Sequence, residues 1–436
     1  MKTIKLTKES IANITSDMLK RNPNNYEQYE KVVKDILEDV KGRGDEAVFK
    51  YTSKFDNANI DATNIKVTED EIIEAYRNIS PQLLEIIQNS LENIRSFHEK
   101  QRLNSWFDTE KPGIMLGQKV TPLARVGVYV PGGKAVYPSS VLMNVMPAVV
   151  AGVDEIIMTT PCDKDGRIEA EVLVAANEAG VNEIYKIGGA QAIGALAYGT
   201  DTIAKVDKIV GPGNIYVALA KKMVYGLVSI DSIAGPSEIL VLADESANPR
   251  FVAADLLSQA EHDELASAVL VTTSEKLANE VVVEIERFTK KLSRSEIIKK
   301  SLEQFGFILI AESLTEAISA ANEIASEHLE IMTGNPFEVM TQIKNAGAIF
   351  IGPYSSEPLG DYFAGPNHIL PTNGTAKFFS PLEVTDFMKK SSVIYYSKEA
   401  LEAVHEEIES FAKAEQLTAH ANSIAVRFEE EETSDE

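Results

Sequence analysis

Between residues 126 and 351, short runs rich in β-branched residues alternate with longer segments of helical periodicity. This alternation limits what the chain can fold into. The first run, residues 126–130, stops at Pro131-Gly132-Gly133, and a helical pattern follows at residues 139–152. Strands that alternate with helices predict parallel sheets covered on both faces. We therefore expect an α/β fold with two Rossmann-like parallel-sheet domains.

The alternation divides into two series. The first α/β domain is expected at residues 111–235 and the second at residues 236–352, with the boundary near residue 235. In the second domain we expect helices at residues 250–266 and 276–290, and another that begins near Leu314. The predicted strands are residues 126–130, 155–160, 183–187 and 208–210 in the first domain, and 238–242, 268–273, 307–311 and 348–351 in the second.

The flanking segments have other patterns. Residues 1–110 are predicted to form an N-terminal helical layer, with Thr68 and Glu71 placed as a capping box. Residues 353–380 are rich in Gly and Pro and are predicted to be a loop region that returns to the first domain. Residues 381–428 are predicted to be a domain-swapped dimerisation segment with a helix at 398–411, and residues 429–436 a disordered acidic tail.

Composition excludes several classes of function. The net charge of −24 disfavours nucleic acid as a partner, because a phosphate backbone would be repelled. The longest apolar stretch, residues 141–153, is too short to span a bilayer and contains Asn144 and Pro147. The N-terminus lacks the apolar core of a signal peptide, so a soluble cytoplasmic protein is expected. The single cysteine, Cys162, allows no intrachain disulfide and is interpreted as structural.

Glu327 and His328 stand side by side at the predicted end of the helix that begins near Leu314. Adjacent helical residues point about 100° apart, so the two side chains would not face each other. They could flank one substrate from two sides, which suits two proton transfers. The alternative is a charged helix end in solvent.

A second group of residues offers nitrogen and oxygen ligands. Gln259 and His262 lie three apart on a predicted helix and would project from one face, although a solvated face is the alternative. Asp361 and His368 lie in the Gly- and Pro-rich loop region. Glu415 and His420 are far along the chain, so their segment must fold back or reach a partner subunit. Together Gln259, His262, Asp361 and His420 would suit zinc, but the spacing does not establish that they converge.

Glycine turns at residues 131–133, 188–189 and 211–213 follow predicted strands. Backbone amides at such turns could approach a pyrophosphate. None of the three completes the G-x-G-x-x-G pattern, and a tight strand-to-helix turn explains each equally well.

In combination, seven segments resemble the motif series of the histidinol dehydrogenase family, and the match runs in order from about residue 120 to 424. These segments are RVGVYVPGG at 125–133, KIGGAQAIG at 186–194, VGPGNIYV at 210–217, AGPSE at 234–238, SQAEHD at 258–263, SEHLE at 326–330 and GPNH at 365–368.

The resemblance implies a zinc-dependent, NAD-linked, four-electron oxidation of L-histidinol through L-histidinal to L-histidine, the last step of histidine biosynthesis. It implies a homodimer in which the C-terminal segment completes the partner's site. It further implies these roles: one zinc per subunit held by Gln259, His262, Asp361 and His420; acid–base catalysis by Glu327 and His328; NAD contacts from Tyr129, Gln191 and Asn214; and substrate contacts from Ser237, His328, His368, Glu415 and the zinc ligands.

Within that chemistry, His328 suits the base that takes the hydroxyl proton, and Glu327 suits the group that activates the hydrating water. Two other classes of function stay open from the residues alone. A zinc hydrolase or deaminase would use Glu327 on water and form no NADH. A non-catalytic sensor would bind an imidazole ligand without turnover.

Overall fold

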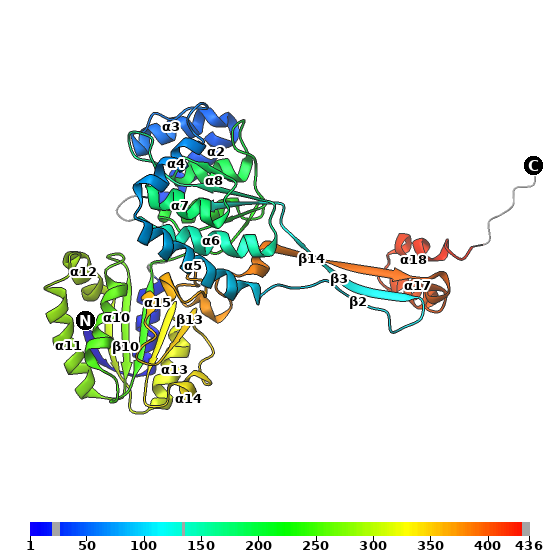
Figure 1. The fold of residues 1–436 in the computed structure, drawn as a ribbon. Helices are drawn as coiled ribbons and strands as arrows, with labels where there is room; N and C mark the ends of the chain where they lie inside the picture. The colour runs from blue at the N-terminus through cyan, green and yellow to red at the C-terminus, as the bar shows by residue number, and fades with distance from the viewer. Residues whose placement is uncertain (20–26, 133–135, 430–436) are drawn as a thin grey trace, which may run out of the picture. The chain divides into compact units, whose positions relative to one another are not determined.

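The computed structural model of the protein describes residues 1–19, 27–132 and 136–429 (Figure 1). Gly133 of the first glycine turn and the acidic tail beyond Glu429 lie outside the described residues. The chain forms two compact units. Unit 1 comprises Met1–Arg102 and Leu123–Phe387, and unit 2 comprises Leu103–Pro122 and the chain from Met388 onward.

The first α/β domain in unit 1 is built on a parallel sheet with strand order β6-β5-β4-β7-β8. Its central strand, β4, is buried from Val126 to Tyr129, as expected for a strand covered on both faces. The strands are β4 (Arg125–Tyr129), β5 (Glu155–Thr159), β6 (Glu183–Tyr185), β7 (Lys208–Val210) and β8 (Ser229–Ile230).

Helices connect and cover these strands. Helices of the N-terminal region pack on this domain: α2 packs on α8 and α9, α4 packs on α7, and α5 packs on α6. The capping box of Thr68 and Glu71 is confirmed at the start of α4. The helices are α2 (Glu27–Arg43), α3 (Asp45–Asp56), α4 (Glu69–Asn78), α5 (Pro81–Glu99), α6 (Pro138–Ala151), α7 (Ala170–Ala179), α8 (Gly189–Tyr198) and α9 (Ile215–Val224).

The second α/β domain has a larger parallel sheet with strand order β1-β11-β10-β9-β12-β13. A separate apolar cluster packs on each face of this sheet, around Leu240 on one face and Val241 on the other. The strands are β1 (Lys2–Lys5), β9 (Glu238–Ala243), β10 (Ser267–Thr272), β11 (Gly306–Ile310), β12 (His328–Met332) and β13 (Ala348–Ile351). The helices are α1 (Lys8–Leu19), α10 (Pro249–Ala260), α11 (Glu275–Thr289), α12 (Ser295–Phe305), α13 (Leu314–Ile324), α14 (Pro336–Met340) and α15 (Glu357–Tyr362). The α/β fold with two parallel sheets is thus confirmed.

The start of the chain differs from the expected helical layer. Residues Lys2–Lys5 form β1, which pairs in parallel with β11 at the edge of the second sheet. The strand contains a single apolar residue, Ile4, and its side chains are mostly exposed. An edge strand of this kind lacks the continuous apolar run of a central parallel strand, so pattern alone does not identify it.

Two predicted helix ends are wrong. Helix α13 ends at Ile324, and Ala325 adopts a left-handed conformation with φ +53°. The chain then enters β12 at His328, so Glu327 and His328 lie at the start of a strand and not on a helix. Helix α10 ends at Ala260, so His262 lies in the turn that follows. The sequence pattern did not indicate these two helix ends, because alanine, which stands at both, favours continuing a helix and seldom ends one.

Between the second domain and unit 2, the chain forms two 3₁₀ turns, η2 (Thr375–Lys377) and η3 (Val384–Phe387). Unit 2 is an antiparallel sheet with strand order β14-β3-β2, followed by short helices. The single helix predicted at residues 398–411 is two helices, and the long strand β14 was not predicted. The elements are β2 (Trp106–Asp108), β3 (Ile114–Pro122), β14 (Met388–Tyr396), α16 (Lys398–Glu402), α17 (His405–Ala414) and α18 (Thr418–Ala425). In the parts of the chain that the structure describes, no helix has the length and apolar character needed to cross a membrane.

Candidate functional site

Glu327 and His328 both bond to the backbone of Glu238, the first residue of the neighbouring strand β9. The Glu238 N–H donates to Oε2 of Glu327 at 2.9 Å, and the Nδ1–H of His328 donates to the Glu238 carbonyl oxygen at 2.9 Å. Oε2 of Glu327 lies 3.7 Å from Nδ1 of His328, so the two side chains do face each other, contrary to the helical expectation.

This arrangement selects one tautomer of His328. A carbonyl oxygen can only accept, so Nδ1 carries the proton and Nε2 of the neutral ring is an acceptor. Burial lowers the pKa of His328 to about 4, which keeps the ring neutral at pH 7. Nε2 is buried, and within the described residues it has no hydrogen-bond partner. His328 is therefore equipped to take up a proton at Nε2.

The side chain of Glu327 is buried as well. Burial raises its pKa well above the ordinary range, and the N–H of Glu238 opposes that effect only in part. The carboxylates of Glu238, Asp361 and Glu357 raise it further. A cation in this region would favour the ionised form of Glu327.

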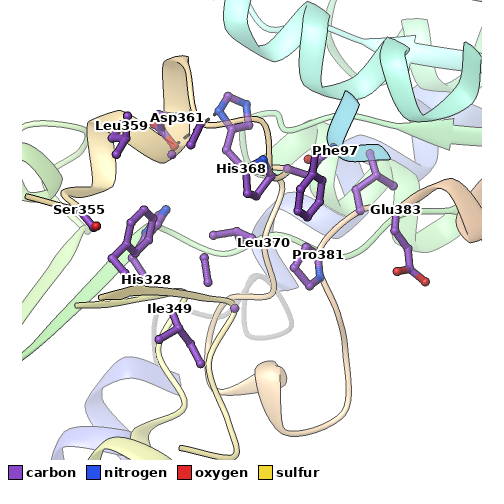
Figure 2. Close-up of a pocket in the computed structure, with 18 of the residues that line it drawn as sticks. Phe97, His328, Ile349, Ser355, Leu359, Asp361, His368, Leu370, Pro381 and Glu383 are labelled. Atoms are coloured by element: carbon purple, nitrogen blue, oxygen red, sulfur yellow. Dashed lines mark ion pairs between the residues drawn. The ribbon is translucent and has the colours of Figure 1, made fainter. Parts of the chain in front are cut away.

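A cavity of about 440 Å³ in unit 1 is lined by His328, Asp361 and His368, among other residues. Figure 2 shows Leu359 and Asp361 on α15, with His368 directed at Asp361. Oδ1 of Asp361 lies 3.5 Å from Nδ1 of His368. Burial acts to raise the pKa of Asp361, but the interaction with the nearby imidazole of His368 outweighs burial and lowers the pKa below the usual value. Three of the predicted site residues thus meet at one cavity.

Potential metal ligands lie beside this cavity. One ligand atom each of His262, Glu357 and Asp361 lies within 4.8 Å of the others. Gln259, three residues before His262, is fully buried, and neither its amide oxygen nor its amide nitrogen has a hydrogen-bond partner among the described residues. A buried amide without partners costs free energy unless a ligand engages it. The donor set of imidazole, carboxylate and amide oxygen fits zinc.

Glu357 was missed by the sequence predictions. It begins α15, is 2 % exposed, and lies one helical turn before Asp361, so both carboxylates are on the same face of that short helix. Burial, and then the charge of Asp361, raises the pKa of Glu357 to about 8. The i, i+4 spacing of Glu357 and Asp361 in a loop region is the sequence signal that points to Glu357.

Ser237 directly precedes Glu238, the residue whose backbone holds Glu327 and His328. Its carbonyl oxygen accepts the N–H of Ser267 at 3.0 Å, which ties it to the start of β10. Ser237 is therefore one residue along the chain from Glu238, whose backbone bonds to both members of the acid–base pair.

A separate cavity of about 370 Å³ is lined by Tyr129, Gln191 and Asn214, the three predicted NAD-binding residues. The N–H of Gly189 donates to the Tyr129 hydroxyl at 3.2 Å, and burial raises the pKa of Tyr129 to about 12. Gln191 is 1 % exposed, and in the described part of the chain its amide oxygen has no partner. Asn214 caps α9 by accepting the N–H groups of Tyr216 and Val217.

Gly132 and Gly189, from two of the predicted glycine turns, line this cavity. Helix α8 begins at Gly189, and Gly188 is its N-cap. Gly211 has φ +117°, and a Cβ atom there would lie 2.0 Å from the carbonyl oxygen of Tyr129. Only glycine fits that position, which brings the Gly211 turn against the end of β4.

The sole cysteine, Cys162, is buried, and burial raises its pKa to about 11. A protonated thiol is a poor nucleophile, which agrees with a structural role.

Glu415 and His420 belong to unit 2, on the segment of α17 and α18. The structure brings these two residues together in one hollow of about 890 Å³, whose other lining residues are largely apolar, including Phe411 and Leu417. The remaining predicted site residues are in unit 1.

The chain is similar to proteins of known family. The sequence model of the histidinol dehydrogenase family matches residues 19–428. The histidinol dehydrogenase of Bacillus licheniformis is 57% identical over 425 residues, covering 97% of this chain and 99% of that protein. That of Bacillus subtilis is 58% identical over 401 residues, covering 92% and 93%.

Among solved structures, histidinol dehydrogenase from Elizabethkingia anophelis has a TM-score of 0.92 and 38% identity, covering 98% of each chain. From the family match, these relatives and the shared fold, the chain belongs to the histidinol dehydrogenase family of oxidoreductases.

Proposed function

We propose that the protein is a zinc-dependent, NAD-linked histidinol dehydrogenase that oxidises L-histidinol through L-histidinal to L-histidine with transfer of four electrons. The observation that carries this proposal is the state of His328. Its neutral ring presents Nε2, which has no hydrogen-bond partner among the residues that the structure describes, at a cavity that Asp361 and His368 also line. A base held in that form suits removal of a proton from an alcohol.

Gln259, His262 and Asp361 would hold the zinc in unit 1, with His420 supplied by a C-terminal segment. When bound, zinc would orient the amine and imidazole nitrogens of histidinol and favour negative charge on the reacting oxygen. His368 would hold Asp361 in place through its 3.5 Å contact. Ser237, His368 and Glu415 would contact the substrate.

In the first oxidation, Nε2 of His328 takes the hydroxyl proton as the carbinol carbon gives up a hydride to NAD⁺. The products are the aldehyde, NADH and the protonated imidazole, which must release its proton to solvent. The bond from Nδ1–H to the Glu238 carbonyl fixes the ring through this change and stabilises the cationic form.

The second oxidation needs a water molecule. Glu327, in its ionised form, takes a proton from water as the oxygen attacks the aldehyde carbon, which leaves Glu327 protonated and the hydrate as its monoanion. The monoanion then gives a second hydride to another NAD⁺ and its remaining hydroxyl proton to a base, and the product is the carboxylate. The contact of Glu327 with the N–H of Glu238 holds the carboxylate in one orientation throughout.

The cavity of Tyr129, Gln191 and Asn214 would bind NAD. It combines a buried amide oxygen without a partner in the described residues, a buried phenol and a glycine-lined strand-to-helix turn. The amide and the phenol can hydrogen-bond to a dinucleotide, and the glycines let the protein backbone approach it closely.

The protein would act as a homodimer. In unit 2, the described residues of α16 and α17 include no buried side chain, and the strands β2 and β14 are exposed or half-exposed along their length. Apolar side chains such as Ile394 and Phe411 are more than 70 % exposed in this unit. Helices this short gain little stability alone, which supports docking on a partner that receives Glu415 and His420.

The proposal is tested by following NADH absorbance with histidinol, NAD⁺ and zinc. Two NADH per histidinol consumed are expected, with histidine as the product. A zinc hydrolase or deaminase would consume substrate without NADH, and a sensor would bind histidinol without turnover. Either result would contradict the proposal.

A further inference from the structure

We propose that Glu357, which is outside the predicted ligand set, is an anionic member of the metal site and a determinant of metal affinity. This inference rests on the proposed zinc dependence. It concerns the residue that begins α15 and its contacts with α10, β12 and the turn that carries His262.

The first argument is the position of its carboxylate. Oε1 of Glu357 lies 3.9 Å from Nε2 of His262, and ligand atoms of Glu357, His262 and Asp361 lie within 4.8 Å of one another. Ligand atoms on one zinc ion at bond lengths of about 2.0–2.2 Å lie about 3–3.5 Å apart. The distances between the three ligand atoms are therefore only slightly longer than those between groups that share one cation. A small change of rotamer would bring the atoms to that spacing.

The second argument is how firmly Glu357 is held. Its Oε2 accepts the hydroxyl of Ser258 on α10 at 3.0 Å. Its backbone N–H, one of the unpaired donors at the start of a helix, donates to Oε1 of Glu330 on β12 at 2.9 Å. Side chain and backbone are thus fixed by two different elements, and Oε1 is left facing His262. This preorganisation is typical of a side chain that positions a metal or its ligands.

The third argument is charge. Glu330 and Glu357 are 1 % and 2 % exposed, and Asp361 lies next to Glu357. The ion-pair partners of Glu357 and Asp361 among the described residues are imidazoles, His262 and His368, and no Lys or Arg of the described chain forms an ion pair with either. Buried carboxylates without a permanent cation are costly, and a divalent ion would offset that cost.

Together these observations give Glu357 two tasks. Its charge would raise the affinity of the site for a divalent cation, and its contact with His262 would fix the ring in the exposed turn after α10. It would do so without supplying or removing a proton in the reaction, so it is a positioning residue.

The test measures zinc affinity of the purified full-length protein by competition with a chromophoric chelator, and the visible absorption of the cobalt-substituted protein. Glu357→Gln should keep the bond to Ser258 and lose the charge. We expect zinc affinity to fall by about 10–100-fold and the cobalt spectrum to change. Glu357→Asp, which keeps the charge on a shorter side chain, should also weaken binding and serves if the first variant fails to fold.

Asp255→Asn is the matched control. Asp255 is a nearly buried carboxyl that bonds to Glu330 but is not among the groups clustered around His262. The Asp255→Asn protein should bind zinc with an affinity within about threefold of wild type. An equal loss in Asp255→Asn and Glu357→Gln would overturn the inference, because the effect would then be general to buried acids.

His262→Ala separates this inference from the proposed function. If His262→Ala binds zinc as well as wild type, the zinc site itself is wrong. If His262→Ala loses zinc while Glu357→Gln and Glu357→Asp bind it with unchanged affinity and an unchanged cobalt spectrum, the zinc site stands and only the role of Glu357 is wrong.

Discussion

Oε2 of Glu327 lies 3.7 Å from Nδ1 of His328, although successive side chains of a strand point to opposite faces. The contact is possible because Glu327 precedes the first residue of β12 and is not yet constrained by the pleat. Both side chains turn toward the backbone of Glu238, where one accepts an N–H and the other donates to the carbonyl. Their imidazole–carboxylate pairing therefore depends on the register of β12 with β9, in which His328 pairs with Ile239.

Substitutions of this pair should separate the two oxidations. Glu327→Gln should slow oxidation of supplied histidinal more than oxidation of histidinol to the aldehyde, because only the former needs an activated water. His328→Asn should slow the alcohol step at least as much as the aldehyde step. Loss of a general base costs about 10²–10⁴-fold in rate. Single-turnover measurements with each substrate check both expectations. Equal losses in both steps for Glu327→Gln would remove the division of roles.

Removal of metal should abolish activity. Treatment with a strong chelator should give an inactive protein, and zinc should restore it, because Gln259, His262 and Asp361 offer only nitrogen and oxygen ligands. Zinc at about 100 times its dissociation constant should raise the free energy of unfolding by about 2.7 kcal/mol, measured by thermal denaturation of both forms. Full activity in a preparation shown to be free of metal would contradict the zinc site.

Mixed dimers test whether a site is shared between chains. His420→Ala and Glu327→Gln chains, each inactive alone, are refolded together. If His420 serves the partner's site, each mixed dimer has one site with both defects and one with neither. Random pairing then returns activity toward about a quarter of wild type. No recovery, with heterodimers confirmed by mass, would mean that each chain completes its own site.

Asp56, the last residue of α3, should make stability depend on pH. Burial raises its pKa from 3.8 to about 6 in the folded protein, and its Oδ2 is buried without a partner among the described residues. The folded state binds this proton more tightly than the unfolded state. The stability that results is complete below about pH 4 and is lost as pH rises through about 6.

Asp56→Asn should therefore be more stable than wild type at pH 7.5, by about 1–2 kcal/mol after allowance for partial solvent exposure, with the difference vanishing near pH 4. Urea denaturation at both pH values checks this. Asp35→Asn, on the exposed side of α2, should change stability by less than about 0.5 kcal/mol at either pH. An Asp56→Asn variant with the same difference from wild type at both pH values would exclude the titration.

Lys221 and Asp231 form an ion pair whose side chains are 3 % and 4 % exposed. Both also bond to Gly211: Lys221 Nζ donates to its carbonyl at 2.9 Å, and Asp231 accepts its N–H at 2.8 Å. Lys221→Met should cost about 3–5 kcal/mol, because it leaves a buried carboxylate unpaired. Adding Asp231→Asn should recover part of that loss in urea denaturation. A loss below about 1 kcal/mol for the single variant would mean that the pair contributes little.

Much of the fold could be predicted from the sequence, because central parallel strands are continuous apolar runs. The runs at residues 126–130 and 238–242 became β4 and β9 nearly as expected. Strands with few apolar residues or with both faces exposed could not be found this way. β1 contains one apolar residue, and β14 alternates weakly because neither of its faces is buried within unit 2.

Part of the candidate site could likewise be predicted from the sequence, and part could not. The residue types in its motifs pointed to acid–base and metal chemistry. The end of α13 at Ala325 was not visible, because an alanine in a left-handed conformation is held by its surroundings and not by its own preference. Only its i, i+4 spacing from Asp361 marks Glu357 in the sequence, since its burial and its contacts with Ser258 and Glu330 depend on segments distant in sequence.

The pairing of β1 with β11 has a consequence for synthesis of the chain on the ribosome. Lys2 pairs with Phe307, so the first strand to emerge must wait for a partner made much later, after the whole first α/β domain. Contacts between residues so distant in sequence form slowly. The first domain can fold while that strand is still unpaired, and this edge of the second sheet closes only after β11 (Gly306–Ile310) has been made. A bulky tag fused directly to Met1 would hinder this late step while the N-terminal helices of the first domain form normally.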